Sequence, residues 1–451
     1  MKLRRNMLQP LRLEIDQRHP SPMASPHHST DQDCDSISSR LRNAFETSNS
    51  LHFLRFDARP SSLLQEYSEQ RQDSIAGNLF RTANRIHASV DTVVVLSLGN
   101  AALGAKAIAQ ACCQPFWNHL SRADRGSKPR MFFIDDHSDN DTIQGVLHLL
   151  GCHRPTTSNF DLDRWGLLVL ATDAPPHHPS PTETQTGQTW QLEAVLRALR
   201  KHVANDESEI SQRLMAVAPT SGAIAKKLSQ YGSYDFFPSE DEPPAFQCFG
   251  PLGLLPATLL GVNIMELLAG ASWMSQHFHQ TDPADNLVLR LMTWLAKDGT
   301  TINQTDQFRI WSPSLRGWQE WYRDLWSTSK DSVPASHSHE SPQVHASHSS
   351  RSSEINLVVE RPRFDPIELG VSGNSQEQWI ASIMQHLQSS RGQGLACGEI
   401  RMAELDELHT GQLMQFTLLL STSCRMLGWV PPAASGLRFE ADDRSEDTAC
   451  P

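Results

Sequence analysis

The feature that most constrains the fold is a repeated alternation of apolar strand patterns and amphipathic helix patterns between residues 93 and 231. VVVLSL, MFFIDD, WGLLVLAT and RLMAVA are short, near-continuous apolar runs, and a helical pattern follows each of them. Strands of this composition are buried on both faces, as in a parallel sheet that helices cover on each side. We therefore predict a doubly wound α/β domain with right-handed crossovers.

A second, less regular alternation follows the apolar run GPLGLLPATLLGVNIMELLAGASWM. This run contains prolines and several glycines, which favours a bent core helix over a membrane span. The strand patterns FRIWSP and INLVVERP, together with the amphipathic segments around them, predict a second α/β domain. The predicted fold class is therefore α/β, with two parallel-sheet domains.

Composition shifts predict how the chain is divided. Residues 1–45 are rich in Ser, His, Pro and Asp, which predicts a disordered tail. Residues 46–245 are expected to hold the N-terminal helices and the first domain, and residues 246–440 the linking core helix and the second domain. A low-complexity insert is expected at 329–353, and a loose acidic tail at 441–451.

Charge and cysteine content narrow the class of protein. The formal net charge of -12 argues against a nucleic-acid partner. The eight cysteines form no C-x-x-C pair, so we expect free thiols in a reducing compartment. The N-terminus lacks the apolar core of a secretory signal, and no run of about 18 apolar residues occurs. We therefore expect a cytoplasmic protein with no membrane segment.

The turn after the first strand has the layout of a phosphate-binding loop. Two glycines, Gly99 and Gly104, lie five positions apart at the start of a helical pattern. A nucleotide-binding P-loop needs Lys and Ser or Thr directly after the second glycine, but the residues here are Ala105, Lys106 and Ala107. The dinucleotide pattern G-x-G-x-x-G is also absent. A ligand loop and a tight packing turn both remain open.

Two clusters of conspicuous residues have structural explanations. The Ser-rich insert holds four histidines with no apolar frame to fix a metal site, so we predict a surface segment and no metal. These are His337, His339, His345 and His348. Four tryptophans lie at core spacings, so we predict that they are buried rather than exposed for binding. These are Trp311, Trp318, Trp321 and Trp326.

Five segments, in this order, resemble the glucose-6-phosphate isomerase family, which is built from two sugar-isomerase (SIS) domains. They are VVVLSLGNAALGAKAI, MFFIDDHSDNDTIQGVL, GLLPATLLGVNIMELLAGASWM, WSPSLRGWQEWYRDLWSTS and LDELHTGQLMQFTLLLSTSCRMLGW followed by VPPAASG. The resemblance runs from about Leu41 to Glu440. It implies two SIS-like doubly wound domains flanked by N- and C-terminal helices.

The resemblance also implies an activity. The family interconverts glucose 6-phosphate and fructose 6-phosphate without metal or cofactor. A histidine and a lysine help to open the sugar ring, a glutamate moves a proton between C2 and C1, and an arginine offsets the developing negative charge. A sugar-phosphate ligand and a homodimer are implied as well.

The catalytic roles of the family fall on unsuitable side chains when they are carried over position by position. The arginine, the glutamate base, the histidine and the lysine fall on Ala245, Thr328, Ser352 and Ala441. Because the insert is of low complexity, His348 or His345 could replace the histidine. Asp173 and Glu354 are further candidate substitutes for the acid–base groups, with Lys330 and Arg438 as candidate cations.

The phosphate-binding segments also depart from the family. After the third strand the family has Ser-Lys-Ser-Gly-Thr-Thr, whereas this chain has ATDAPPHHPS. Asp173 would repel a phosphate, and each proline removes a backbone donor. In the first turn, Ser97, Asn100 and Ala101 replace two glycines and a serine of the family. The residues expected to bind substrate are Gly99, Asn100 and Thr172.

Three hypotheses follow. The leading one is an isomerase homologue that is weak or silent in catalysis and binds sugar phosphate at most, since losing a general base alone costs about two to four powers of ten in rate. The second is an active isomerase in which other side chains have taken over the acid–base roles. The third is a structural subunit that pairs with itself or with an intact paralogue.

Overall fold

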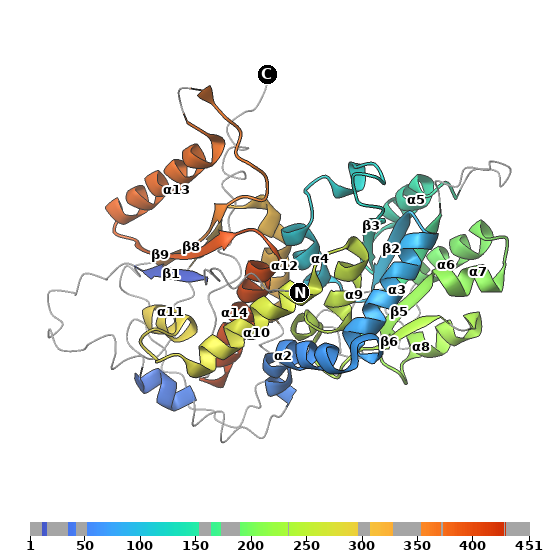
Figure 1. Cartoon of the computed structure of the whole chain (residues 1–451), viewed down its shortest axis with the longest axis horizontal. Helices are drawn as coiled ribbons and strands as arrows, with labels where there is room; N and C mark the ends of the chain where they lie inside the picture. The colour runs from blue at the N-terminus through green and yellow to red at the C-terminus, as the bar shows by residue number, and fades with distance from the viewer. Residues whose placement is uncertain are drawn as a thin grey trace. The chain divides into compact units, whose positions relative to one another are not determined.

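The computed structural model divides into two compact units, Ala58–Leu268 and Met1–Asp57 with Ala269–Pro451. Figure 1 shows the elements of both units. The structure describes residues 11–15, 35–41, 52–152, 164–172, 190–232, 234–295, 307–327, 353–370, 373–427 and 429.

The unit Ala58–Leu268 contains a five-stranded sheet in which every neighbouring pair of strands is parallel. The strand order is β3-β2-β4-β5-β6. The strands are β2 (Thr92–Ser97), β3 (Arg130–Asp135), β4 (Trp165–Leu170), β5 (Leu214–Ala218) and β6 (Asp235–Pro238). The chain first steps from β2 to β3 and then returns past β2 to β4. The order therefore reverses between β2 and β4.

Helices cover both faces of this sheet, as the alternation predicts. Alternate residues of β2, β4 and β5 share one hydrophobic core with α5 (Asn140–Leu149) and α6 (Trp190–His202). The other residues of these strands are buried too, and α3 (Ile75–Ser89), α4 (Leu103–Cys112) and α9 (Pro251–Leu260) pack together on that side. The remaining helices are α7 (Glu207–Arg213), α8 (Ala223–Leu228) and most of α2 (His52–Gln70). The doubly wound fold is confirmed.

The apolar run predicted as one bent core helix is in fact two helices. α9 ends at Gly261, whose φ of 83° is left-handed, and α10 (Ile264–Gln280) begins three residues later. Glycine tolerates this conformation as a helix C-cap, where a side chain would also meet Lys128. Because α9 packs on α3 and α4, the first unit extends to Leu268. This division differs from the predicted boundary between residues 245 and 246.

The second unit contains a four-stranded sheet in the order β1-β9-β8-β7. Strands β7 (Gln307–Ile310), β8 (Ser353–Arg361) and β9 (Ala396–Glu404) are parallel, and β1 (Arg12–Ile15) pairs antiparallel with β9. Helices α11 (Leu287–Leu295), α12 (Arg316–Ser327), α13 (Ser375–Gly392) and α14 (Glu407–Met426) belong to this unit. Every residue of α14 from His409 to Cys424 is buried.

The predicted disordered tail is wrong for two of its segments. Leu11 and Leu13 are buried on either side of the exposed Arg12, which is the alternation of an edge strand with one buried face. Residues 35–41 are helical, and Ile37 and Leu41 are buried. The polar composition of residues 1–45 hid these short apolar patterns.

Two smaller predictions, on the tryptophans and on the cysteines, are confirmed. Each of the four tryptophans predicted to be core residues is at most 3% exposed. The described cysteines, which include Cys112 and Cys113, are free thiols. Within the described segments, no helix has the length and apolar character needed to cross a bilayer.

Candidate functional site

The candidate site lies at the carboxyl ends of β2 and β4, where the strand order of the first unit reverses. Ligands of open α/β sheets bind in the crevice at such a point. Gly99 and Asn100 follow β2, and Thr172 follows β4. The backbone N–H of Leu98 donates to the carbonyl of Leu170 over 2.9 Å, so the two strand ends are held together. The three residues predicted to bind substrate thus lie on neighbouring loops at one edge of the sheet.

The turn after β2 is closed by its own hydrogen bonds. Gly99 has a left-handed φ of 60°, which reverses the chain after the strand. The Ser97 hydroxyl donates to the Gly99 carbonyl over 3.0 Å and accepts from the N–H of Ala102, also over 3.0 Å. The helix α4 that follows has no side-chain cap at Ala102. The serine that replaces a glycine of the family therefore braces the turn.

The carboxylate of Asp136 accepts a hydrogen bond from the backbone of this turn. The N–H of Gly99 donates to Oδ2 of Asp136 over 3.1 Å. Asp136 comes directly after β3 and is only 2% exposed. Its carbonyl accepts a 2.8 Å hydrogen bond from Nε2 of the buried Gln191, which fixes its position. An anion that approached Gly99 would meet this negative charge at close range, and like charges repel.

The neighbouring charges form a second small network. Asp135 accepts a 3.0 Å hydrogen bond from the Ser138 hydroxyl, and Nζ of Lys106 lies 3.9 Å from its carboxylate. Lys106 also lies over the ring of Phe133, 5.9 Å from the ring centroid. Lys106, which lies one position after the lysine position of a P-loop, is thus turned towards the acidic end of β3. The site combines two carboxylates with one ammonium group and with the imidazole of His137, whose Nε2 lies 3.9 Å from Oδ1 of Asp136.

The segment that aligns with the family's arginine holds a buried ion cluster. Ala245 is 1% exposed within the short helical turn Pro244–Gln247. Arg59 of α2 donates to the Phe246 carbonyl and forms ion pairs with Glu240 and Glu242. This arginine is only 7% exposed, and a buried charge needs a partner of opposite sign, which Glu240 and Glu242 both offer.

Other groups of this segment are equally buried. Nε2 of Gln247 donates to the carbonyls of Glu240 and Glu242, which fixes the acidic loop around Arg59. Burial raises the pKa of the Cys248 thiol to about 12, so this cysteine is inert as a nucleophile. Sequence reasoning missed the cluster, because its only signal was the acidic loop PSEDEPPAF, whose composition is that of an ordinary linker.

Glu354, a candidate substitute base, lies elsewhere. It is the second residue of β8, at the amino end of the strand, and it is 6% exposed. Its Oε1 lies 2.9 Å from Nε2 of His386 and accepts a 2.9 Å hydrogen bond from Asn356. Ser390 contacts the same Nε2 of His386, so these three side chains cannot relay a proton through both ring nitrogens. Glu354 is a structural partner beneath α13.

The remaining predicted residues lie outside the described residues. These are Asp173, Thr328, Lys330, His345, His348, Ser352, Arg438 and Ala441. The four histidines of the low-complexity insert also lie there. Among the residues that are described, no three His, Cys, Asp or Glu side chains gather closely enough to hold a metal ion.

In sequence, the chain is similar to several glucose-6-phosphate isomerases. No family model matches the chain. A glucose-6-phosphate isomerase of Lactiplantibacillus plantarum is 22% identical over 254 residues, which cover 55% of this chain and 50% of that protein. One of Heliobacterium modesticaldum is 25% identical over 252 residues, covering 55% and 51%. The match therefore spans about half the length of these relatives.

Solved structures share the fold over most of the chain. A hypothetical protein of Thermus thermophilus superposes with a TM-score of 0.63 at 16% identity, covering 90% of this chain and 92% of that one. A glucose-6-phosphate isomerase of Chlamydia trachomatis gives a TM-score of 0.60 at 14% identity, covering 89% and 81%. At these identities the structures establish the fold alone.

Proposed function

We propose that this chain, a divergent relative of the glucose-6-phosphate isomerases, keeps their scaffold but turns over glucose 6-phosphate weakly or not at all. The observation that carries this proposal is the hydrogen bond from the Gly99 N–H to the Asp136 carboxylate. It sets a buried negative charge at the sheet edge where a phosphate would have to bind. Any remaining ligand binding is therefore that of a weak sugar-phosphate site.

The loss of acid–base groups supports the same conclusion. The aligned positions Ala245, Thr328, Ser352 and Ala441 offer no group that is charged or titrates near neutral pH. A positioned general base contributes about two to four powers of ten in rate, and electrostatic stabilisation contributes a similar amount. These contributions are not additive, but their joint loss leaves little of the reaction.

The surroundings of Ala245 argue against a simple replacement of the arginine. Arg59 lies close to this segment, but its charge is already matched by Glu240 and Glu242. A guanidinium held by two carboxylates has little positive potential left to stabilise an enediolate. Arg59 is therefore best explained as a structural residue.

The active-isomerase alternative needs a carboxylate, a cation and an imidazole that converge on one sugar. Of the proposed substitutes, the structure describes only Glu354, and its carboxylate already contacts His386 and Asn356.

We further propose a cytoplasmic location and no nucleic-acid partner. The net charge of -12 supports the second of these.

A coupled isomerase assay on the purified full chain tests the proposal. The protein should be produced in a host that lacks its own glucose-6-phosphate isomerase, because trace contamination would mimic weak activity. We expect turnover at least about a thousandfold below the ordinary enzyme value of about 10 per second. Turnover within about tenfold of that value would contradict the proposal and favour the active alternative.

A further inference from the structure

A hollow of the first unit lies between helix α3 and the edge strand β6. Its volume is about 500 Å³, which is within the usual range for small-molecule sites. One wall is a face of α3 that carries Ile75, Asn78 and Thr82. Residues 234–238 form the other wall. In the sheet order, β5 separates β6 from β4, so the hollow is distinct from the candidate site at the ends of β2 and β4.

The Thr82 side chain is the strongest indication of a ligand. It lines the hollow and is only 5% exposed. The hydroxyls of Thr293 and Thr417 donate to the carbonyl one helical turn earlier, over 2.8 and 2.7 Å. The Thr82 hydroxyl, by contrast, has no hydrogen-bond partner among the residues that the structure describes. Because a buried polar group without a partner destabilises the fold, a hydrogen bond from a ligand is favourable at this position.

The charge of the hollow selects an anion. Nη2 of Arg81 donates to the backbone carbonyl of Gln72 over 2.7 Å, and no carboxylate of the described residues forms an ion pair with it. The other two charges in the lining cancel, because Arg85 is ion-paired with Asp235. The positive charge of Arg81 is therefore unmatched. A guanidinium binds a carboxylate or a phosphate group through two parallel hydrogen bonds.

Strand β6 adds a backbone donor and an apolar wall. The Ser239 N–H donates to the Ala218 carbonyl of β5 over 2.9 Å, so Phe237 also faces β5. The N–H of Phe236 therefore points away from the sheet, at its open edge. Pro238, the next residue that faces outwards, has no N–H, which disfavours the addition of another strand here. The edge is thus better suited to a small ligand than to an extended peptide.

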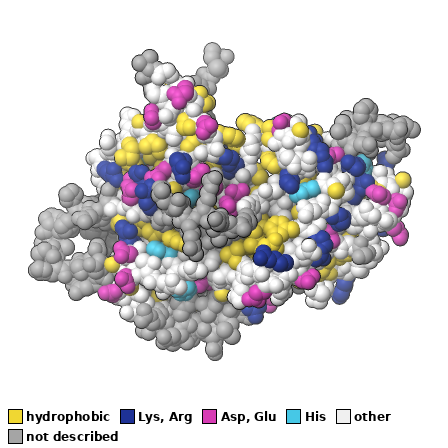
Figure 2. All heavy atoms as spheres, in the orientation of Figure 1, with side chains coloured by type: hydrophobic (Ala, Val, Ile, Leu, Met, Phe, Trp, Pro, Cys, Tyr) yellow, Lys and Arg dark blue, Asp and Glu magenta, His cyan; other side chains and the backbone are white. Residues whose placement is uncertain are grey.

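The surface of the first unit does not suit a large polyanion. Figure 2 shows Lys and Arg side chains scattered over this unit on the face in view, rather than gathered in one broad patch. Nucleic acids bind to broad basic patches. The unmatched charge at Arg81 therefore favours a small anion.

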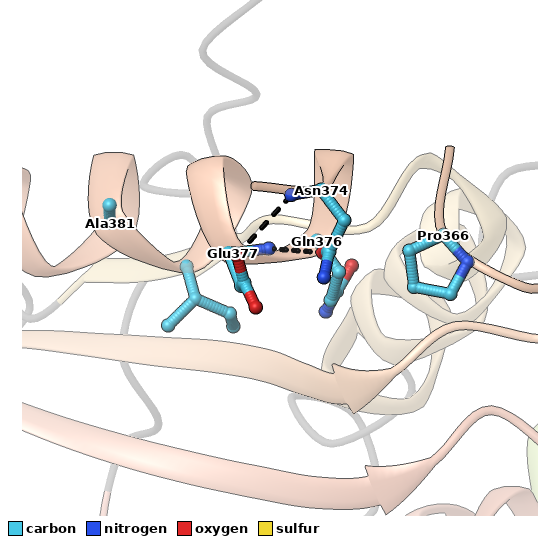
Figure 3. Close-up of a pocket in the computed structure, with 6 residues that line it drawn as sticks. Pro366, Asn374, Gln376, Glu377 and Ala381 are labelled. Carbon is cyan, nitrogen blue, oxygen red and sulfur yellow. Dashed lines mark hydrogen bonds between the residues drawn. The ribbon is translucent and has the colours of Figure 1, made fainter. Parts of the chain in front are cut away.

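A hollow of about 460 Å³ beside α13 in the second unit provides a contrast (Figure 3). Its polar side chains are already engaged. Asn374 and Glu377 form the capping box of α13, drawn as dashed lines in Figure 3. Nε2 of Gln376 donates to the Glu360 carbonyl over 2.8 Å. The hollow beside β6 is the better ligand site, because Thr82 and Arg81 retain their capacity to bind.

We propose that the hollow between α3 and β6 binds a small organic anion. The Arg81 guanidinium and the Thr82 hydroxyl bind its carboxylate or phosphate group. Phe237 and Pro238 contact its apolar body. The proposal does not rest on the proposed function, since none of these residues belongs to the candidate site.

Titration of benzoate and of phenyl phosphate into the full chain, followed by ligand-observed NMR, tests the proposal and distinguishes the two acid groups. We expect at least one of them to bind with a Kd of about 1 mM, the affinity that a ligand of this size reaches in a fitting site. Benzamide keeps the ring of benzoate without its charge, so it should bind at least about tenfold more weakly than the better acid. Failure of both acids to bind at about 10 mM, or equal binding of benzamide, overturns the proposal.

Two variants locate the bound anion. Arg81→Gln removes the charge, and Thr82→Val removes the hydroxyl while nearly keeping the shape of the side chain. Each should weaken binding of the better acid by about fivefold or more. Arg197→Gln, at an exposed position of α6, and Thr293→Val are the matched controls and should leave binding unchanged.

Thermal unfolding separates a lost ligand contact from a damaged fold. Thr82→Val should unfold at the wild-type temperature or above it, because its hydroxyl has no protein partner to lose. Thr293→Val should unfold earlier, since it loses the hydrogen bond to the Leu289 carbonyl. Binding that either Arg81→Gln or Thr82→Val leaves unchanged overturns the assignment of the site. None of these outcomes depends on isomerase activity.

Discussion

The backbone N–H of Gly99 and the carboxylate of Asp136 form a 3.1 Å hydrogen bond between the ends of the adjacent strands β2 and β3. Asp136 is only 2% exposed and its carbonyl accepts a hydrogen bond from Gln191, so its carboxyl group is held in place at the sheet edge. In the turn that resembles a phosphate loop in sequence, the Gly99 N–H therefore already binds a carboxylate of the chain. This contact is the basis of our proposal that the chain binds a sugar phosphate weakly.

The ion cluster around Arg59 should matter for stability. Arg59→Met leaves Glu240 and Glu242 without their cation, and breaking a buried ion pair costs about 3–5 kcal/mol. Urea denaturation should show a loss of this size in the free energy of unfolding. Adding Glu242→Gln to Arg59→Met should recover part of the loss, because one uncompensated charge is removed.

Arg213→Met is the control for this experiment. Its partner Glu209 is 44% exposed, and such pairs contribute about 1 kcal/mol or less. Equal losses for the two arginine variants would contradict the structural role of the buried cluster.

Gly373 should be intolerant of any side chain. Its φ is 82°, and a Cβ atom would lie 2.3 Å from Oε2 of Glu377, which belongs to the capping box of α13. Gly373→Ala should lower the free energy of unfolding by about 2 kcal/mol through strain and the lost cap. Gly370→Ala has a similar φ of 68° but open space around it. An equal effect of the two variants in thermal unfolding would show that the cap is not involved.

The pair formed by His279 and Asp57 should make stability depend on pH. The hydrogen bond to Asp57 raises the pKa of His279 above its ordinary value of 6.5. The stability that this pair contributes is therefore fully present below about pH 6.5. It is lost as the pH rises through the higher pKa of His279 in the folded protein. The His279 side chain is 52% exposed, so the effect is small.

Thermal unfolding of wild type and His279→Gln at pH 5.5 and pH 8.5 measures this dependence. We expect the difference between the two proteins to be larger at pH 5.5. A difference that grows at pH 8.5 would contradict the assigned direction. His119→Gln at an exposed position serves as the control.

Much of the first unit could be predicted from its sequence, because long apolar runs that alternate with amphipathic helices leave few other folds. The strand β1 could not, since its four residues lie within a polar stretch and pair with β9, near the other end of the chain. The break at Gly261 was missed for a different reason. The hydrophobic run continues across the end of α9, so the pattern does not mark it. The end is marked by the left-handed φ of Gly261, which is known only from the structure.

The candidate site was predicted less completely than the fold. The proximity of Gly99 and Thr172 follows from the rule that parallel strands end at one edge. The partner of Gly99 depends on the orientation of the Asp136 side chain, which no sequence pattern specifies. Arg59 and Glu242 are 183 positions apart, so their contact could not be inferred from spacing either.

Calorimetric titration of glucose 6-phosphate into the wild type and Asp136→Asn tests the central claim most directly. The variant keeps an acceptor for the Gly99 N–H but removes the charge of the side chain. An adjacent like charge weakens the binding of an anion by about a factor of ten or more. Asp141→Asn, at an exposed acidic residue in the first turn of α5, is the control. We predict binding to Asp136→Asn that is at least about tenfold tighter than to the wild type and the control. Tight binding to the wild type that Asp136→Asn weakens would contradict the account.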